Sequence, residues 1–290
     1  MLPADMKKVP WQAMLEEALN RPGMLASAYH LFHTYSLGNQ ILATIQLGDK
    51  LGPIATYKRW SELGRQVKKG EKAIALYMPV AVKDDRSANA DAADDDEQHA
   101  PRRTQRVIFL LRRRWFSLAQ TEGPTEPEFP PSPAWSLERA LRALEIERIP
   151  FDDTSGNRQG FARPTRRQIA VSPIAAYPYK TAVHEMAHVL LHGEAAEFAH
   201  SASRLPRSVE EAEAEAVAFI VVATLGLHGE DALSSARAYI QGWLSDPEAR
   251  AAFAKKHAAR VFGAAQRILR AGQEQAAEED SEPFVEAEVA

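Results

Sequence analysis

Three histidines and one glutamate lie close together in the stretch TAVHEMAHVLLHG, residues 181–193. On a helix, His184 and His188 are four residues apart and project from one face. Two imidazoles at that spacing can bind one Zn²⁺ ion at about 2.0–2.1 Å. Glu185 lies one residue further round, where a carboxylate can act as general base on a water molecule. The spacing predicts a metallohydrolase site, with His184 and His188 as ligands and Glu185 as catalytic residue, rather than a purely structural helix.

The third metal ligand must come from another part of the chain. A tetrahedral catalytic zinc site takes three protein ligands and leaves its fourth position open. The chain has no cysteine, so this ligand must be a His, Asp or Glu. One group of HExxH enzymes places a Gly and a third His shortly after the motif, at positions that are Leu191 and Glu194 here. That group is therefore excluded, and His192 is expected to be a surface or helix-end histidine.

A later acidic segment, residues 208–222, offers carboxylates for this role. It reads SVEEAEAEAVAFIVV, and its second half is almost wholly apolar, which predicts a buried helix. The candidate ligands are Glu210, Glu211, Glu213 and Glu215. Glu213 lies between two alanines and, by helical phase, faces inward beside Val217 and Ile220. The pattern favours Glu213 as the third ligand and keeps Glu210 and Glu215 as alternatives.

The composition is that of a soluble globular protein. Of the 290 residues, 45% are hydrophobic and 26% are charged, and no disulfide can form without cysteine. The longest apolar run, residues 216–227, is too short to span a bilayer. The N-terminus lacks the basic and then apolar layout of a signal peptide. We therefore expect a cytoplasmic protein with no membrane partner.

The charges are distributed unevenly along the chain. Residues 1–124 carry 18 Lys and Arg against 14 Asp and Glu, whereas residues 125–290 carry 17 against 25. Seven of the acids in the first part fall within residues 84–97. The remainder of the first part is therefore strongly basic and is expected to attract polyanions, which the second part should repel.

Two segments of biased composition divide the chain. Residues 84–104 are rich in Ala and Asp, which predicts a mobile loop. Residues 121–135 contain five prolines, which indicates a semi-rigid linker. We therefore expect a domain at 1–124, a linker at 125–135, a second domain at 136–272 and a disordered acidic tail at 273–290.

Both domains are expected to belong to the α+β class. In the first, helical patterns precede two strand-like runs, 73–82 and 106–111, which would pair as a hairpin around the acidic loop. In the second, residues 136–147 read as an amphipathic helix capped by Ser136, and short strands follow. Further helices are predicted near 179–192, 208–226, 233–245 and 248–271.

Several motifs occur in the order found in one known family. The first half contains YSLGNQILATIQ (35–46), WSELGRQVKKGEKAIALYMPV (60–80) and WFSLAQTEG (115–123). These segments resemble the N-terminal single-stranded-DNA-binding domain of the ArdC family of antirestriction proteins. The second half contains HEMAH (184–188), EAEAEAVAFIVV (211–222) and SSARAYIQGWL (234–244), which resemble the metallopeptidase domain that follows in that family. The resemblance implies a small α+β DNA-binding domain followed by a zincin-like α+β metallopeptidase domain.

The basic first domain has the residue types that a single-strand binder needs. Such proteins combine cationic groups for phosphates with aromatic rings on which bases stack. Here Lys and Arg alternate with Tyr57 and Trp60, although Trp60 is equally well explained as a core residue of the domain. The predicted DNA-binding residues are Asn39, Gln40, Tyr57, Lys58, Arg59, Trp60, Arg65, Lys68, Lys69 and Lys72.

The residues and the resemblance together predict an antirestriction protein that binds single-stranded DNA and protects incoming mobile-element DNA. A Zn²⁺ ion, or another divalent ion such as Mn²⁺, would be held by His184, His188 and Glu213. Glu185 would activate water to cleave an unidentified peptide substrate. Two alternatives stay open: a non-catalytic single-stranded-DNA-binding protein with a structural metal site, and a regulatory metallopeptidase that cleaves a repressor.

Overall fold

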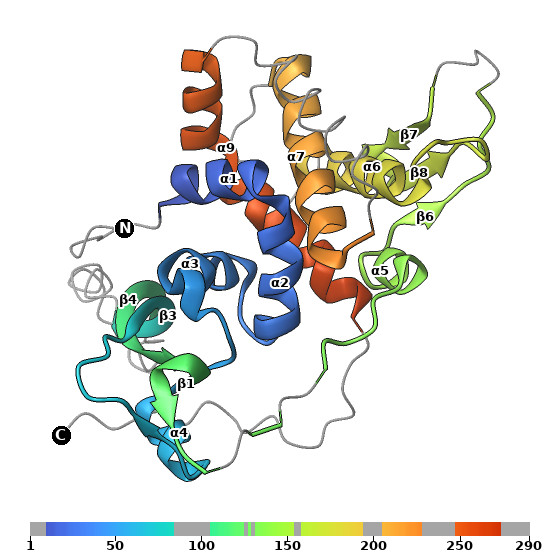
Figure 1. Cartoon of the computed structure of the whole chain (residues 1–290). Coiled ribbons are helices and arrows are strands. Elements are labelled where there is room, and N and C mark those ends of the chain that lie inside the picture. The colour runs from blue at the N-terminus through green and yellow to red at the C-terminus, as the bar shows by residue number, and fades with distance from the viewer. Residues whose placement is uncertain are drawn as a thin grey trace, which may run out of the picture. The chain divides into compact units, whose positions relative to one another are not determined.

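The computed structural model describes residues 10–83, 105–124, 127–128, 131–153, 158–193, 205–227 and 247–273 (Figure 1). The chain forms two compact units. The smaller unit comprises Met1–Pro10 and Leu42–Glu128, and the larger unit comprises Trp11–Ile41 and Phe129–Ala290. This division differs from the predicted one at the N-terminus, because residues 11–41 group with the larger unit and not with the rest of the domain predicted at 1–124.

The smaller unit is built around a three-stranded antiparallel sheet. Its elements are the end of α3 (Leu37–Leu47), β1 (Ile54–Thr56), α4 (Tyr57–Glu62), β2 (Gln66–Val67), β3 (Ile74–Lys83), β4 (Gln105–Ser117) and β5 (Thr121–Glu122). The central strand is β4, which pairs with β1 on one side and β3 on the other. The predicted hairpin is confirmed, since Met78 in β3 lies opposite Leu110 in β4. The predicted loop at 84–104 lies outside the described residues.

The larger unit combines a small sheet with a group of helices. Its elements are α1 (Trp11–Asn20), α2 (Pro22–Phe32), the start of α3, α5 (Leu137–Ala143), β6 (Glu147–Arg148), β7 (Gly160–Arg163), β8 (Gln168–Val171), α6 (Pro178–His192), α7 (Arg207–Leu225) and α9 (Pro247–Gly272). In the sheet, β8 lies between β6, to which it is parallel, and β7, to which it is antiparallel. The predicted cap of α5 is confirmed, because the Ser136 hydroxyl accepts a hydrogen bond from the Arg139 backbone N–H.

Helix α7 is the centre of this unit. It packs against α6, α2 and α9, and Figure 1 shows it in orange with these helices around it. Every residue from Ala212 to Thr224 is buried, as is typical of a helix that is covered on all sides. The helix ends at Leu225 and is capped by Gly226, whose φ of 65° lies in the left-handed region that glycine tolerates best.

The N-terminal helices belong to this unit because their apolar faces pack on it. Helix α1 buries Met14, Leu15 and Ala18 and contacts α9, where the rings of Trp11 and Phe262 lie 5.6 Å apart between centroids. Helix α2 contacts α7. Periodicity reveals such apolar faces but does not tell which helix covers them.

The α+β class is confirmed. The predicted helices near 179–192, 208–226 and 248–271 correspond to α6, α7 and α9, whereas the helix predicted at 233–245 and the acidic tail lie outside the described residues. Within the described part of the chain, the helices lack the length and apolar content that a membrane-crossing helix requires.

Candidate functional site

Helix α6 presents its two motif histidines to α7. It begins at Pro178, which has no backbone N–H to leave unsatisfied in the first turn, and packs against β7 and β8 as well as α7. The His184 and His188 side chains are each 15% exposed, so both rings are largely enclosed. Helix α7 runs antiparallel to α6, since Lys180 pairs with Glu215 while His188 lies beside Glu211.

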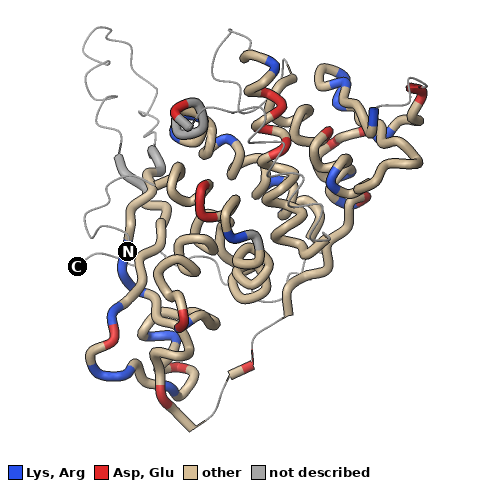
Figure 2. The backbone as a smooth tube through the Cα atoms, turned by 45° about the horizontal axis from the view of Figure 1, so that its top comes forward, with Lys and Arg blue, Asp and Glu red and all other residues tan. Residues whose placement is uncertain are grey.

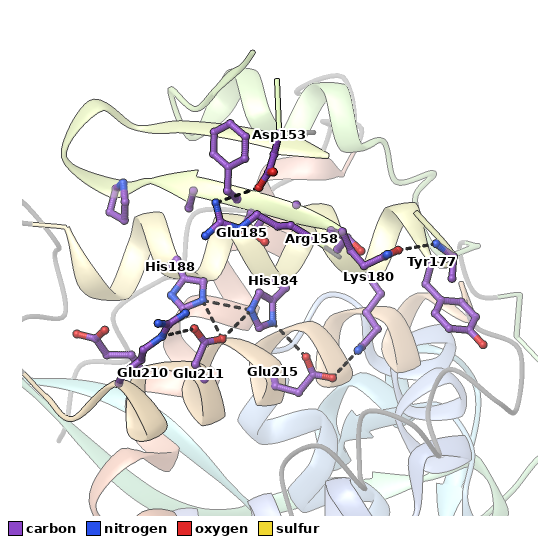
Figure 3. Close-up of a pocket in the computed structure, with 18 of the residues that line it drawn as sticks. Asp153, Arg158, Tyr177, Lys180, His184, Glu185, His188, Glu210, Glu211 and Glu215 are labelled. Carbon is purple, nitrogen blue, oxygen red and sulfur yellow. Dashed lines mark hydrogen bonds and ion pairs between the residues drawn. The ribbon is translucent and has the colours of Figure 1, made fainter. Parts of the chain in front are cut away.

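Three ligand atoms converge between the two helices. The Nε2 atoms of His184 and His188 are 3.1 Å apart. The Oε2 atom of Glu211 lies 3.4 Å from His184 Nε2 and 3.6 Å from His188 Nε2. Within the described residues, this trio is the group of His, Asp and Glu side chains that could hold a metal ion (Figure 3).

The spacing of these atoms fits a tetrahedral metal site. Ligand atoms about 2.0–2.1 Å from a tetrahedral ion lie about 3.3 Å from one another. The three observed separations, 3.1, 3.4 and 3.6 Å, bracket that value. Two imidazoles and one carboxylate are also a ligand set that suits zinc and leaves a fourth position open.

The prediction that Glu213 is the third ligand is wrong. Glu213 is fully buried, but its carboxylate lies 2.9 Å from His192 Nε2 and 2.8 Å from His257 Nδ1. Arg260 Nη1 lies 3.3 Å from the same carboxylate. Residues 211 and 213 are about 200° apart around a helix, so the two side chains leave α7 on different faces.

Burial was a poor guide to the ligand because α7 is buried on every side. A side chain on any face of α7 therefore points into the protein. The fully buried Glu213 contacts His192 and His257 instead of the motif histidines. A better signal was spacing: Glu211 and Glu215 are four residues apart, like His184 and His188, so the two pairs can face each other across antiparallel helices. Glu210, the other alternative, lines the pocket but is not in the trio, and Figure 3 shows its side chain away from the histidines.

Glu215 orients His184 from behind the site. Its Oε2 atom lies 3.1 Å from His184 Nδ1, and its Oε1 atom lies 2.5 Å from Lys180 Nζ. An imidazole that donates through Nδ1 to a carboxylate keeps its Nε2 lone pair for a metal ion. Sequence reasoning had considered Glu215 only as a direct ligand, and Lys180 not at all.

The carboxylates make this centre attractive to a cation. Burial lowers the pKa of His184, but hydrogen bonds to Glu211 and Glu215 outweigh it and raise that pKa to about 9. The same contacts from His184 and His188 hold the pKa of Glu211 far below its usual range. With this raised pKa the His184 imidazole carries a proton and thus a positive charge beside the carboxylates. A divalent ion can replace that proton and supply the positive charge instead.

Glu185 lies in the same pocket, but burial has a larger effect on the pKa of its carboxyl than the nearby histidines do. Its side chain is buried, and burial raises the pKa of its carboxyl. Strand β7 passes very close to it at Gly160, where a Cβ atom would lie 3.1 Å from Glu185 Oε1 and 2.6 Å from Thr181 Cγ2. Glycine at this position therefore lets the edge strand approach the carboxylate.

The site opens into a pocket of about 1200 Å³ between β7, α6 and the start of α7. Arg158, Lys180 and Arg207 line it together with the acidic residues. Arg158 pairs with Asp153 above the helix, as Figure 3 shows, at 3.4 Å. Tyr177 lies at the rim, on the far side of Lys180 from the histidines. This volume is above the range of about 300–1,000 Å³ that is usual for small-molecule pockets.

The predicted DNA-binding residues are placed in several different environments. Tyr57 is 60% exposed. The other exposed members on the smaller unit are Lys58, Arg59, Lys68, Lys69 and Lys72. Figure 2 shows Lys and Arg in blue on this unit and also on the larger one. Arg65 is half-buried and donates to Thr121 Oγ1 at 2.9 Å. Asn39 and the buried Gln40 fall within the larger unit.

Trp60 requires a correction. It is fully buried, and its indole Nε1 donates a hydrogen bond to the Phe116 carbonyl at 2.9 Å. The ring is therefore part of the core of the smaller unit and has no free face on which a base could stack. Phe109 in β4, which sequence reasoning did not single out, is 62% exposed.

Comparison with known proteins identifies the first part of the chain. Residues 3–113 match the family model of the N-terminal domain of anti-restriction factor ArdC. This part of the chain is an ArdC N-terminal domain. Beyond it, the chain is similar over 91% of its length to the crystal structure of Mn(II)-bound antirestriction ArdC protein from the R388 plasmid. The match has a TM-score of 0.51 and 17% sequence identity and covers 98% of that chain, so the fold of this ArdC-like protein extends across both units.

Two further proteins are similar to the chain in sequence. The uncharacterized protein y4eC of Sinorhizobium fredii (strain NBRC 101917 / NGR234) is 29% identical over 209 residues, which cover 68% of this chain and 64% of y4eC. DNA primase TraC of Escherichia coli is 28% identical over 203 residues, which cover 65% of this chain and 14% of TraC. The ArdC-like chain therefore spans less than two thirds of either relative.

Proposed function

We propose that this ArdC-like protein is an antirestriction protein with a divalent-metal peptidase site formed by His184, His188, Glu211 and Glu185. The observation that carries the proposal is the convergence of three ligand atoms beside a buried carboxylate in an open pocket. The ligand set suits Zn²⁺, and the ArdC structure with the same fold contains Mn(II), so either ion is a reasonable occupant. Its biological role would be to protect incoming mobile-element DNA.

The chemistry divides between the metal ion and Glu185. A divalent ion at this site, when bound, polarises a carbonyl oxygen and makes a water molecule beside it more acidic. Glu185 accepts the proton of that water as its oxygen forms a bond to the peptide carbonyl carbon. Glu185 then delivers the proton to the amide nitrogen as the C–N bond breaks. The raised pKa of Glu185 suits both steps, because a carboxyl of higher pKa is a stronger base and can also return the proton near neutral pH.

Metal-dependent hydrolysis tests this part of the proposal directly. Full-length protein loaded with Zn²⁺ or Mn²⁺ should release fragments from an unstructured substrate such as casein, as followed by mass spectrometry. Treatment with EDTA should stop the release, and re-addition of the ion should restore it. Absence of cleavage across a varied peptide library, with the ion bound, would contradict a peptidase function.

The smaller unit supports the proposal that the protein also binds single-stranded DNA. The match to the ArdC N-terminal domain, residues 3–113, includes most of this unit. The exposed lysines of the unit provide the cationic component of the proposed DNA-binding surface. Tyr57 and Phe109 replace the buried Trp60 as the exposed rings on which bases could stack. The peptide substrate and the DNA would therefore use different parts of the chain.

Single-strand binding predicts two separable effects. Replacing Tyr57 by Ala should weaken binding by about 1–3 kcal/mol with little change in salt dependence, because stacking is not ionic. Replacing Lys69 and Lys72 by Gln should reduce the salt dependence by about 0.7 per lost phosphate contact. Fluorescence anisotropy of single-stranded and duplex oligonucleotides, at several salt concentrations, measures both.

The matched control is Tyr179, a tyrosine of the larger unit that is 48% exposed. Its replacement by Ala should leave the DNA affinity unchanged. The single-strand assignment fails if the wild-type protein binds both DNA forms equally, or if the two tyrosine variants behave alike.

A further inference from the structure

A buried chain of polar side chains continues from the metal centre into the larger unit. His188 Nδ1, on the side of the ring away from the trio, lies 3.0 Å from His192 Nδ1. His192 Nε2 lies 2.9 Å from the Glu213 carboxylate. The His192 side chain is 5% exposed and that of Glu213 is 0% exposed, so both are largely shielded from solvent.

Glu213 is held rigidly at the end of this chain. His257 Nδ1 lies 2.8 Å from its Oε1 atom, and Arg260 Nη1 lies 3.3 Å from the same atom. A second nitrogen of Arg260 donates to the Leu191 carbonyl at 3.0 Å, which ties α9 to the end of α6 next to His192. The ring of Phe253 stacks on His257 with centroids 5.1 Å apart. The carboxylate thus has a fixed position with respect to His192.

The contacts determine which nitrogen carries each proton. An ionised carboxylate only accepts hydrogen bonds, so His192 must donate to Glu213 through Nε2. His192 Nδ1 and His188 Nδ1 share one hydrogen bond, so one of these nitrogens donates and the other accepts. A metal ion at the trio needs the lone pair of His188 Nε2, so His188 donates through its Nδ1 and His192 Nδ1 accepts.

We propose that His192 and Glu213 are positioning residues for the metal site, which hold His188 in the tautomer and ring orientation that a metal ion requires. Glu215 orients His184 by a direct contact with its Nδ1 atom. Glu213 acts on His188 indirectly, through the imidazole of His192. This inference rests on the proposed metal site. It assigns a role to a largely buried pair of residues that neither lines the pocket nor contacts the three ligand atoms.

Two replacements of His192 separate positioning from simple packing. Asn carries its side-chain oxygen where histidine has Nδ1, so His192→Asn keeps the acceptor for His188 but loses the donor to Glu213. Gln reaches further and can place its NH₂ group where histidine has Nε2, so His192→Gln keeps the donor to Glu213 but loses the acceptor for His188. The two variants therefore each break a different link of the chain.

His192→Gln should have the larger effect on metal affinity, whereas His192→Asn should have the larger effect on stability. Titration of Zn²⁺ or Mn²⁺ into metal-free full-length protein should show a loss of about 10–100-fold for His192→Gln, the usual effect of losing such a partner, and little loss for His192→Asn. Thermal unfolding in EDTA should instead show the larger decrease for His192→Asn, because Glu213 then lacks one donor. A role confined to packing would give parallel changes in both measurements.

The outcomes distinguish this inference from the proposed metal site. His184→Ala serves as the reference for loss of a direct ligand and should abolish measurable binding. If His192→Gln binds the metal ion as tightly as the wild type while His184→Ala does not bind it, the positioning role is overturned and the metal site is not. Failure of the wild-type protein to bind either ion would overturn the metal site and, with it, the positioning role.

Discussion

Replacing Glu185 by Gln should lower kcat for peptide hydrolysis by about 10²–10⁴-fold, the usual contribution of a general base. Gln has nearly the same shape but cannot accept the proton of the attacking water. Glu185 is not one of the three converging ligands, so the metal content of the variant should equal that of the wild type. A fluorogenic peptide that contains a cleavage site found in the casein experiment measures kcat. Metal analysis of the purified variant measures its metal content.

Glu210→Gln is the matched control, since Glu210 lines the same pocket but is not in the trio. Its kcat should stay close to that of the wild type. The pH profile gives a second check: the base acts when ionised, and burial raises the pKa of Glu185, so the acid limb of kcat/KM should lie above the ordinary carboxyl value of 4.5. Wild-type rates in Glu185→Gln would exclude the role of Glu185.

Replacing Glu213 by Gln should destabilise the metal-free protein by about 3–5 kcal/mol at pH 7. The reason is that the variant leaves the largely buried Arg260 without its counter-charge, and it weakens the acceptor to which two histidines hydrogen-bond. Urea unfolding in EDTA, followed by circular dichroism, measures this loss. The control is Glu17→Gln, which removes an exposed pair with Arg21 and should cost less than about 1 kcal/mol. Equal effects of the two replacements would contradict the account of the cluster.

The effect of Glu213 should depend on pH in a defined direction. Burial would raise the pKa of Glu213, but hydrogen bonds from His192 and His257 overcome it and lower that pKa to about 2 from 4.5. A carboxyl whose pKa is lower in the folded state stabilises that state above pH 4.5, and this contribution is lost as the pH falls from 4.5 toward 2. The difference between wild type and Glu213→Gln should therefore shrink by up to about 3 kcal/mol over that window.

The sequence was sufficient to predict the site helix and the class of chemistry. The HExxH spacing places two histidines on one helix face whatever surrounds the helix, so His184 and His188 could be named from local geometry alone. The Ser136 cap was predictable for the same reason, since it depends on neighbouring residues in the chain. The β3–β4 hairpin was predictable because its two strand-like runs follow one another in the sequence.

Features that depend on long-range packing were not predictable in this way. Glu211 and Glu213 are two residues apart in similar alanine-rich surroundings, and only the packing of α7 between α6 and α9 decides which faces the motif histidines. Trp60 looked like a stacking platform because its neighbours are basic, yet its indole N–H is satisfied inside the unit. The polar partners on α9, His257 and Arg260, have no local motif that would indicate a role.

We expect His184, His188 and Glu211 together to bind one divalent ion. The most direct test of this expectation is calorimetric titration of Zn²⁺ and Mn²⁺ into the metal-free wild type, Glu211→Gln and Glu210→Gln. The wild type and Glu210→Gln should each bind one ion per chain. Glu211→Gln should show a severe loss of affinity, because a site with three protein ligands becomes one with two. Unchanged binding by Glu211→Gln, or weaker binding by Glu210→Gln than by Glu211→Gln, would contradict this ligand set.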